Sequence, residues 1–172
     1  DVTRSLIRKL FETEAGDQQI EELLEVRFQI MTSQVTVEPF VHVLLEALSE
    51  QFQLGLISNY PCSRSINHCL TEHGLDRWFK TVVVSADVGH VKPHRLLFEQ
   101  AVTEMGVRPE ATLYVGDNWL GDVQGAKRFG MRAAWITQYV PYEKFDREPG
   151  HHEPDLIIEH LQELTGLVSF KG

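Results

Sequence analysis

Residues 112–136 read TLYVGDNWLGDVQGAKRFGMRAAWI and contain the pattern that decides the fold. The runs TLYVG (112–116) and RAAWI (132–136) are short and apolar, as in buried strands, and the residues near 120–129 have the spacing of a helix that stops at Gly130. A strand, a helix and a second strand in this order form a βαβ unit, which places the two strands parallel to each other.

The same alternation extends through most of the chain. Further apolar runs, LGLIS (54–58), TVVVS (81–85) and DLII (155–158), alternate with helical patterns near 62–73 and 94–105. Strands and helices that alternate about every 25–30 residues are typical of a doubly wound parallel sheet. The sequence therefore predicts an α/β protein with a Rossmann-like core and helices on both faces of the sheet.

The first 36 residues have a different texture. Apolar residues at helical spacing predict one helix over 3–15 and a second over 17–33, with Asp17 able to cap the second. A third helix begins at Glu38-Pro39, where proline is tolerated in the first turn. We therefore expect a helical segment over 1–36 and an α/β core over 37–172.

Composition excludes several classes of protein. The chain has 172 residues, 42% hydrophobic and 24% charged, which suits a globular domain, and no apolar run reaches the roughly 18 residues of a membrane-spanning helix. Its formal net charge of −9 disfavours binding to nucleic-acid backbones. Cys62 and Cys69 would lie about 10 Å apart along one helix, beyond disulfide reach, which favours a reducing cytoplasm.

Polar side chains follow the predicted strands, at the edge where open parallel sheets bind ligands. Ser58 and Asn59 follow the first strand, Lys92 lies beyond the second, and Asp117 and Asp122 lie beyond the third. Two carboxylates suit Mg²⁺, a hydroxyl with adjacent amides suits phosphoryl oxygens, and a lysine suits an anion whose charge grows in the transition state.

Each of these residues also has a simpler interpretation. Asp117 can cap a helix and Asp122 can complement its dipole, Ser58 can be a turn residue, and Lys92 can be a surface lysine. The combination is harder to dismiss, because serine, lysine and two aspartates each occupy a strand exit in one crevice of the predicted sheet.

The segments LGLISNY, GHVKPHRLLFEQA and YVGDNWLGDVQGAKRFGMRAAWI resemble the second, third and fourth motifs of the haloacid dehalogenase-like (HAD) hydrolase superfamily, over roughly residues 37–165. The resemblance implies that Ser58 binds the phosphoryl group and Lys92 stabilises the nucleophile and the transferring charge. It implies that Asp117 ligates Mg²⁺ and that Asp122 ligates it or orients its waters. The form Gly-Asp-Asn resembles the phosphatase branch, and the third segment resembles the subclass with a helical cap.

The family's first motif, a hydrophobic strand ending in DxD, is not visible in the chain. Asp1 could belong to a stripped version of it, but the helical pattern that follows favours residues 1–36 as the second half of a cap. On this interpretation the core lacks its first strand, which would lie beside the strands that end at Ser58 and Asp117. We then expect a partner, a swapped segment or a rearrangement of the fold to fill the gap left by this strand. A homo-oligomer or a strand-swapped dimer would fill it with a second copy of the chain.

The resemblance implies a Mg²⁺-dependent phosphohydrolase that acts on a small phosphate monoester through an aspartyl-phosphate in the intact protein. We expect the 172-residue chain itself to show almost no turnover. The alternative is a non-catalytic HAD-like domain that has lost the nucleophile and binds a protein partner or a small anion. A true dehalogenase is disfavoured by Asp117, and a receiver domain fails because its acids precede the hydroxyl.

The remaining conspicuous residues have structural interpretations that compete with functional ones. Residues 151–153, His-His-Glu, are either a metal cluster or part of a polar loop, and the loop is the favoured interpretation. His90 and His94 either contact substrate or belong to the loop and helix start around Lys92. Trp119 is expected to pack at the rim of the site.

Overall fold

The computed structural model describes residues 9, 16–138 and 150–168 of the chain. The chain divides into two compact units, residues 1–36 and residues 37–172. The interpretation of the first unit as the tail of a cap stays a prediction. No helix in the described ranges is both long enough and apolar enough to cross a membrane.

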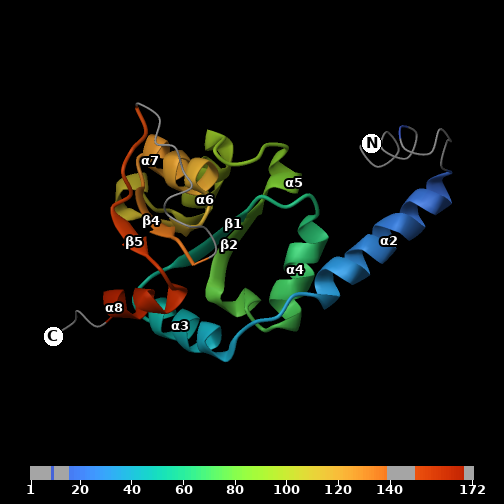
Figure 1. Ribbon diagram of the computed structural model, residues 1–172, viewed down its shortest axis with the longest axis horizontal. Helices are drawn as coiled ribbons and strands as arrows, with labels where there is room; N and C mark the ends of the chain where they lie inside the picture. The colour runs from blue at the N-terminus through green and yellow to red at the C-terminus, as the bar shows by residue number, and fades with distance from the viewer. Residues whose placement is uncertain (1–8, 10–15, 139–149, 169–172) are drawn as a thin grey trace. The chain divides into compact units, whose positions relative to one another are not determined.

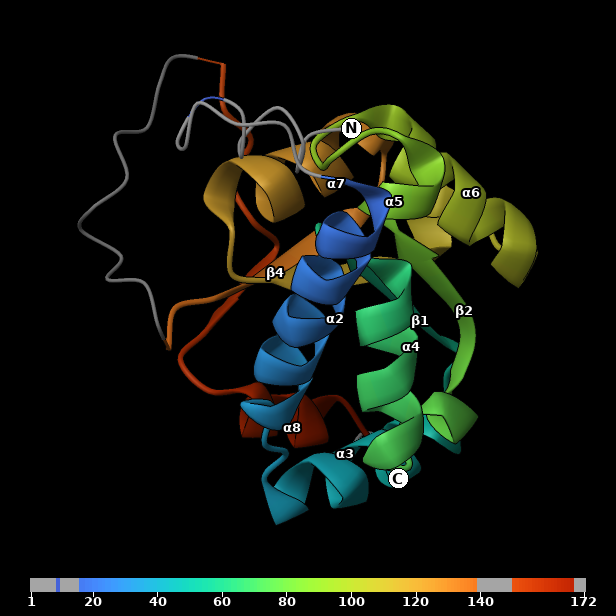
Figure 2. The same ribbon diagram turned by 90° about the vertical axis from the view of Figure 1, so that its right-hand side faces the viewer.

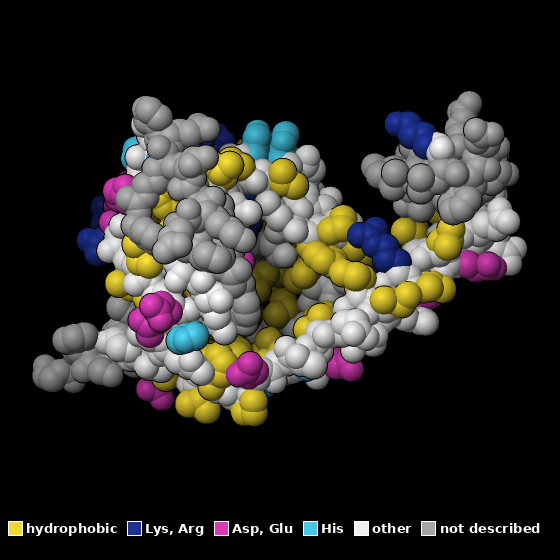
Figure 3. Space-filling view, viewed as in Figure 1, with side chains coloured by type: hydrophobic (Ala, Val, Ile, Leu, Met, Phe, Trp, Pro, Cys, Tyr) yellow, Lys and Arg dark blue, Asp and Glu magenta, His cyan; other side chains and the backbone are white. Residues whose placement is uncertain are grey.

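In the first unit, the described residues form helix α2 (Asp17–Ser33). The residue at the N-cap is Gly16 and not Asp17 as expected, because the Gly16 N–H donates to the Gln19 side chain at 3.0 Å. Large hydrophobic side chains of α2 are exposed, among them Leu23 and Ile30, and Figure 3 shows such side chains along this helix. Apart from Lys9, the helix expected over 3–15 lies outside the described residues.

The second unit alternates strands and helices, as expected. Its elements are α3 (Pro39–Ser49), β1 (Leu54–Ser58), α4 (Ser63–Glu72), η1 (Asp76–Trp78), β2 (Phe79–Val84), α5 (Ser85–Val88), α6 (Arg95–Met105), η2 (Pro109–Ala111), β3 (Leu113–Gly116), η3 (Trp119–Gln124), α7 (Gly125–Phe129), β4 (Arg132–Ile136), β5 (Leu156–Ile158), η5 (Leu161–Leu164) and α8 (Thr165–Val168). Each strand lies within two residues of its predicted bounds.

The helix expected over 120–129 is two elements, a π-helical turn, η3, followed by the short α-helix α7. Asn118 explains the wider turn. Its carbonyl accepts from the N–H groups of both Asp122 and Val123, at 2.8 and 3.3 Å, and its side chain accepts from the Gly121 N–H at 2.7 Å. The extra residue in the turn is a feature of backbone bonding that hydrophobic periodicity does not record.

The strands are parallel, which confirms the predicted α/β class, but they form two ladders. β1 pairs with β2, so that Ser58 lies opposite Val84, and β3, β4 and β5 form a second ladder in which Gly116 lies opposite Trp135. Among the described residues no ladder joins β1 to β3, and Figures 1 and 2 show the two ladders apart. The sheet is therefore divided between β1 and β3, where the strand of the missing first motif is expected to lie.

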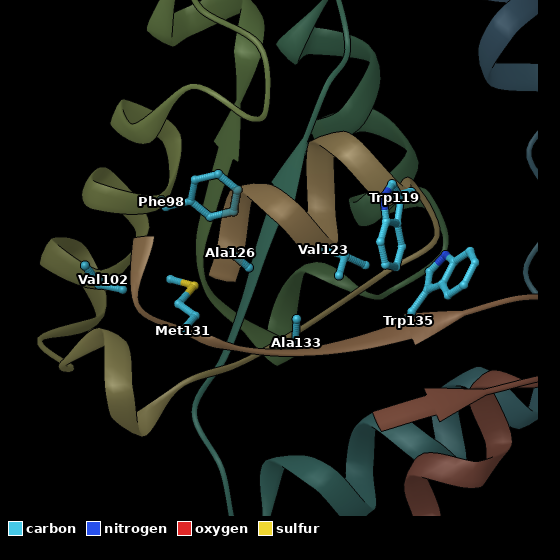
Figure 4. Packing of buried hydrophobic residues seen from close by; sticks show 8 residues of the cluster. All are labelled: Phe98, Val102, Trp119, Val123, Ala126, Met131, Ala133 and Trp135. Carbon is cyan, nitrogen blue, oxygen red and sulfur yellow. The ribbon is translucent and has the colours of Figure 1, made fainter. Parts of the chain in front are cut away.

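Helix α6 packs against both ladders. Its Leu97 and Ala101 pack with Val83 of β2, and its Phe98 packs with the larger cluster around β4. Figure 4 shows that cluster, which joins α6, η3, α7 and β4 through Phe98, Val102, Trp119, Val123, Ala126, Met131, Ala133 and Trp135. Burying a large apolar side chain contributes about 1.5–3 kcal/mol, so α6 and this cluster hold η3 firmly in place. A smaller cluster joins α3 to the C-terminal elements through Leu44, Ile158 and Leu164.

Asp155 fixes the start of β5. Its Oδ2 accepts from the Lys127 ammonium at 2.7 Å and from the Ala133 N–H at 2.8 Å, and its own N–H donates to the Ala133 carbonyl at 2.8 Å. The hydrogen bond from Lys127 is the main reason why the pKa of Asp155 lies below its usual value, with further lowering by the Ala133 N–H and by Arg132.

We predict that Asp155→Asn lowers the melting temperature by a few degrees at pH 7. The lowered pKa means that ionised Asp155 stabilises the fold above its unfolded pKa of about 3.9, and that this contribution disappears as the pH falls through the lower folded value. Because the ion pair between Lys127 and Asp155 is partly exposed, this contribution to stability is small. Thermal melts between pH 7 and pH 2 should show the variant converging on the wild type below about pH 4, and the exposed control Glu159→Gln should track the wild type throughout. A gap that stays constant down to pH 2 would contradict the assignment.

We also predict that the isolated chain self-associates. The unpaired ladder edges and the exposed apolar side chains of α2 both favour contact with another copy. Sedimentation velocity over a range of concentrations should show species larger than a monomer. The double variant Leu23→Glu/Ile30→Glu separates the two causes, because it removes association through α2 and leaves association through strand edges. A monomer at every concentration would show the prediction to be wrong.

Candidate active site

The structure brings Lys92 and Asp122 together. Lys92 lies in the loop between α5 and α6, Asp122 lies in η3, and the Lys92 Nζ is 2.6 Å from Asp122 Oδ1. The two side chains are 10% and 5% exposed, so the ion pair is almost completely removed from water. A buried pair of this kind is stable only when its remaining donors and acceptors are satisfied.

The Lys92 ammonium has three protons and three acceptors. Besides Asp122, it donates to the Tyr114 hydroxyl at 2.9 Å and to the Ile57 carbonyl at 3.1 Å. Ile57 precedes Ser58 at the end of β1, and Tyr114 lies in β3. Lys92 therefore connects the two ladders at the point where their carboxyl ends approach each other.

Both carboxylate oxygens of Asp122 accept hydrogen bonds from within the chain. Oδ1 accepts from Lys92 and from the Tyr114 hydroxyl, at 3.2 Å, and Oδ2 accepts from the Asn118 N–H at 3.0 Å. Asp117 is different, because its side chain is exposed and has no hydrogen bond or ion pair within the described residues. Its backbone carbonyl is held by the buried Trp135 indole, which donates to it at 2.9 Å.

Asn59 orients the loop that carries Lys92. Its Oδ1 accepts from the Lys92 N–H at 2.7 Å, and its Nδ2 donates to the Lys92 carbonyl at 3.2 Å. Direct contact of Asn59 with substrate stays a prediction. Ser58 is half-buried at the end of β1, next to the Ile57 carbonyl that accepts from Lys92, and its binding of a phosphoryl group also stays a prediction.

The other residues named from the sequence surround this centre. Trp119 is buried in the core beneath η3 and its indole donates to His151 Nδ1 at 3.2 Å, and His152 makes two backbone hydrogen bonds with the buried Gln124 side chain. Within the described ranges no group of three metal-binding side chains is found, and the loop interpretation of residues 151–153 stays a prediction. His90 and His94 are exposed and stack on each other with ring centroids 3.8 Å apart.

Comparison with known proteins decides the family. The sequence profile of the haloacid dehalogenase-like hydrolases matches residues 2–136. The chain belongs to this family. It is thus a hydrolase by family, and the segments that contain Lys92, Asp117 and Asp122 resemble the third and fourth motifs of that family.

Several similar proteins are named as pyrophosphatases or phosphatases. The chain is 31% identical to the pyrophosphatase PpaX of Oceanobacillus iheyensis over 163 residues, which are 93% of this chain and 72% of that protein. It is 30% identical to the glyceraldehyde 3-phosphate phosphatase of Methanopyrus kandleri over 131 residues, which are 74% of this chain and 54% of that protein. The chain thus spans between about half and three quarters of the length of these two relatives.

Solved structures give the same fold. A HAD phosphatase from Thermococcus onnurineus superposes with a TM-score of 0.69 at 30% identity, over 96% of this chain and 70% of that one. A 2-haloacid dehalogenase from Pseudomonas syringae superposes with a TM-score of 0.75 at 26% identity, over 97% of this chain and 70% of that one.

Two residues of this HAD-like site were not identified from the sequence. Tyr114 lies inside an apolar strand, where a tyrosine is usually interpreted as a core residue. The one feature that could have indicated a role in the site was its phenol among aliphatic neighbours. Burial raises its pKa well above 10, and the nearby Asp122 and Asp117 carboxylates raise it further, so the phenol keeps its proton. The sequence shows Gly116 only as the last residue of the strand predicted over 112–116, but the structure shows that the absence of a side chain there matters.

The space next to Gly116 belongs to Asp122. A Cβ added at residue 116 would lie 2.7 Å from Asp122 Cβ and closer still to its carboxylate. Glycine at the end of β3 therefore lets the Asp122 side chain fold back against the strand and reach Lys92.

We predict that Gly116→Ala destabilises the fold by about 1–3 kcal/mol, as overpacking typically does, because Asp122 must move away from Lys92. Urea unfolding measures this loss. The matched control is Gly166→Ala in α8, where an added Cβ meets no atom within 4 Å. Equal unfolding midpoints for the two variants would mean that the Asp122 side chain does not need the room at Gly116.

Proposed function

We propose that the intact protein is a Mg²⁺-dependent phosphohydrolase that acts on a small phosphate monoester. The observation that carries the proposal is the position of the Lys92 ammonium, which is held between Asp122, Tyr114 and the end of β1. The exposed Asp117 belongs to the segment that resembles the family's next motif. Phosphoryl transfer depends mainly on positioning and charge neutralisation, which a fixed cation at the carboxyl ends of parallel strands supplies.

The donor set suits Mg²⁺ at Asp117. This carboxylate is exposed and makes no hydrogen bond with any described residue, whereas both oxygens of Asp122 already accept bonds from Lys92, Tyr114 and Asn118. Mg²⁺ commonly uses one or two carboxylates, waters and substrate phosphate oxygens. We therefore assign Asp117 as the direct ligand and Asp122 as the residue that holds Lys92 and faces the metal's waters. Bound there, the ion would neutralise charge on the phosphoryl oxygens.

The chain's own residues bind and orient the phosphoryl group. Lys92 donates to a phosphoryl oxygen after giving up one of its present acceptors, and Ser58 offers its hydroxyl at the end of β1. In the covalent route, a carboxylate oxygen attacks phosphorus, the bond to the leaving oxygen breaks, and that oxygen takes a proton; water then hydrolyses the aspartyl-phosphate. The first motif of the family, which would supply this carboxylate, is not visible in the sequence, so we place the nucleophile outside the described residues.

The comparisons support a phosphatase over the other candidates. PpaX and the glyceraldehyde 3-phosphate phosphatase of Methanopyrus kandleri are named for phosphate substrates, which supports a small phosphorylated substrate here. A non-catalytic anion-binding domain is not favoured by such relatives. We also propose a cytoplasmic location, consistent with Cys62 and Cys69 not being joined by a disulfide.

The test is hydrolysis of p-nitrophenyl phosphate by the protein in its full genomic length, with and without Mg²⁺. We expect Mg²⁺-dependent turnover that falls at least a hundredfold, an order-of-magnitude figure, in Asp117→Asn and in Lys92→Met. Asp87→Asn, an exposed carboxylate in α5, is the matched control and should leave turnover unchanged. The 172-residue chain alone should turn over almost no substrate.

Three outcomes would contradict parts of this proposal. Turnover that survives Asp117→Asn would show that Asp117 is not the metal ligand. Robust turnover of the 172-residue chain that disappears on Asp1→Asn would make Asp1 the nucleophile. Release of chloride from 2-chloropropionate, without phosphatase activity, would make the protein a dehalogenase.

A further inference from the structure

Tyr114 completes a closed network with Lys92 and Asp122. The Lys92 ammonium contacts both Tyr114 Oη, at 2.9 Å, and Asp122 Oδ1, at 2.6 Å, and Tyr114 Oη lies 3.2 Å from the same Asp122 oxygen. Three polar atoms from three different elements are thus within hydrogen-bond distance of one another.

The chemistry of the three groups sets the direction of every bond in this network. An ammonium group only donates, so the Tyr114 hydroxyl must accept from Lys92. An ionised carboxylate only accepts, so the single hydroxyl proton goes to Asp122. The phenol is therefore the one group that serves as acceptor for the cation and donor to the anion.

Tyr114 is also the most firmly placed of the three side chains. It rises from β3, which pairs with β4, and its ring packs edge-on against Phe98 with centroids 5.4 Å apart. Lys92 reaches the network on a flexible stem from a loop. The rigid ring places the hydroxyl, and the hydroxyl limits where the ammonium can lie.

We propose that Tyr114 is a positioning residue whose hydroxyl keeps the Lys92 ammonium against Asp122 with its third proton directed toward the end of β1. This inference rests on the proposed function. The third acceptor, the Ile57 carbonyl, is at 3.1 Å the longest of the three contacts, and it lies next to Ser58. When a phosphoryl oxygen enters, it replaces Ile57 as acceptor, while Asp122 and Tyr114 keep their bonds to Lys92.

The first test needs no turnover. Tyr114→Phe keeps the ring and removes only the hydroxyl, so packing is preserved. In the ¹⁵N-labelled 172-residue chain, the Lys92 ammonium signal, assigned by its loss in Lys92→Met, should exchange with water about tenfold faster in Tyr114→Phe. The ammonium of Lys80, which donates to Gln53 and to the Met105 carbonyl, is the internal control, and Tyr60→Phe is the matched variant.

The second test uses the full-length protein and p-nitrophenyl phosphate. Tyr114→Phe should lower kcat between about tenfold and a hundredfold, as a misplaced catalytic group does, with KM changed less than twofold and the melting temperature almost unchanged. Tyr60→Phe should match the wild type.

The outcomes separate this inference from the proposed function. Unchanged Lys92 exchange in Tyr114→Phe overturns the inference whatever the activity. Faster exchange with unchanged kcat also overturns it, provided that Lys92→Met abolishes turnover. If Lys92→Met leaves turnover intact, the error lies in the proposed function, and the inference falls with it.

Discussion

The buried ion pair between Lys92 and Asp122 constrains the rest of the structure. Two charges that are 10% and 5% exposed are costly unless every donor and acceptor around them is satisfied. Their partners are Tyr114 from β3, the Ile57 carbonyl from β1 and the Asn118 N–H at the start of η3. The strand β1 and the segment from β3 to η3, which are distant in sequence, must therefore be in place before the pair can form.

Local geometry at the end of β3 makes this arrangement possible. Gly116 leaves room for the Asp122 side chain, and Asn118 bonds to three N–H groups of the turn that follows, which widens it into a π-helix. Trp119 and Val123 of the same turn are buried in the large cluster, so the turn cannot rotate without exposing them. Packing on one face of η3 thus determines where the Asp122 carboxylate on the other side lies.

The charge of the site contrasts with that of the chain. A protein with a formal net charge of −9 must concentrate positive charge locally if it is to hold a phosphate. Lys92 supplies that charge in surroundings of low exposure, where electrostatic interactions are stronger than in water. Asp122 balances Lys92 within the folded chain, and the exposed Asp117 is left to meet a cation from solution. Two similar aspartates five residues apart therefore have different environments and different proposed roles.

Much of the fold followed from local patterns. Alternating apolar runs and helical spacing located β1 to β5 within two residues, because strand and helix periodicity are recorded in short windows of sequence. The division into two ladders was foreseen only as a consequence of the family resemblance, since hydrogen bonding between distant strands leaves no trace in local periodicity.

The candidate site divides in the same way. Ser58, Lys92, Asp117 and Asp122 were predicted as site residues because polar residues after apolar strands are conspicuous, and because parallel strands bring their carboxyl ends to one edge. Tyr114 was not, since a tyrosine within an apolar run is indistinguishable from a core residue until its hydroxyl is seen between Lys92 and Asp122. The sequence by itself determined which residues are available for chemistry. Only the tertiary structure decided that Asp122 is buried against Lys92 while Asp117 is exposed, because burial and hydrogen-bond partners arise when elements distant in sequence pack together.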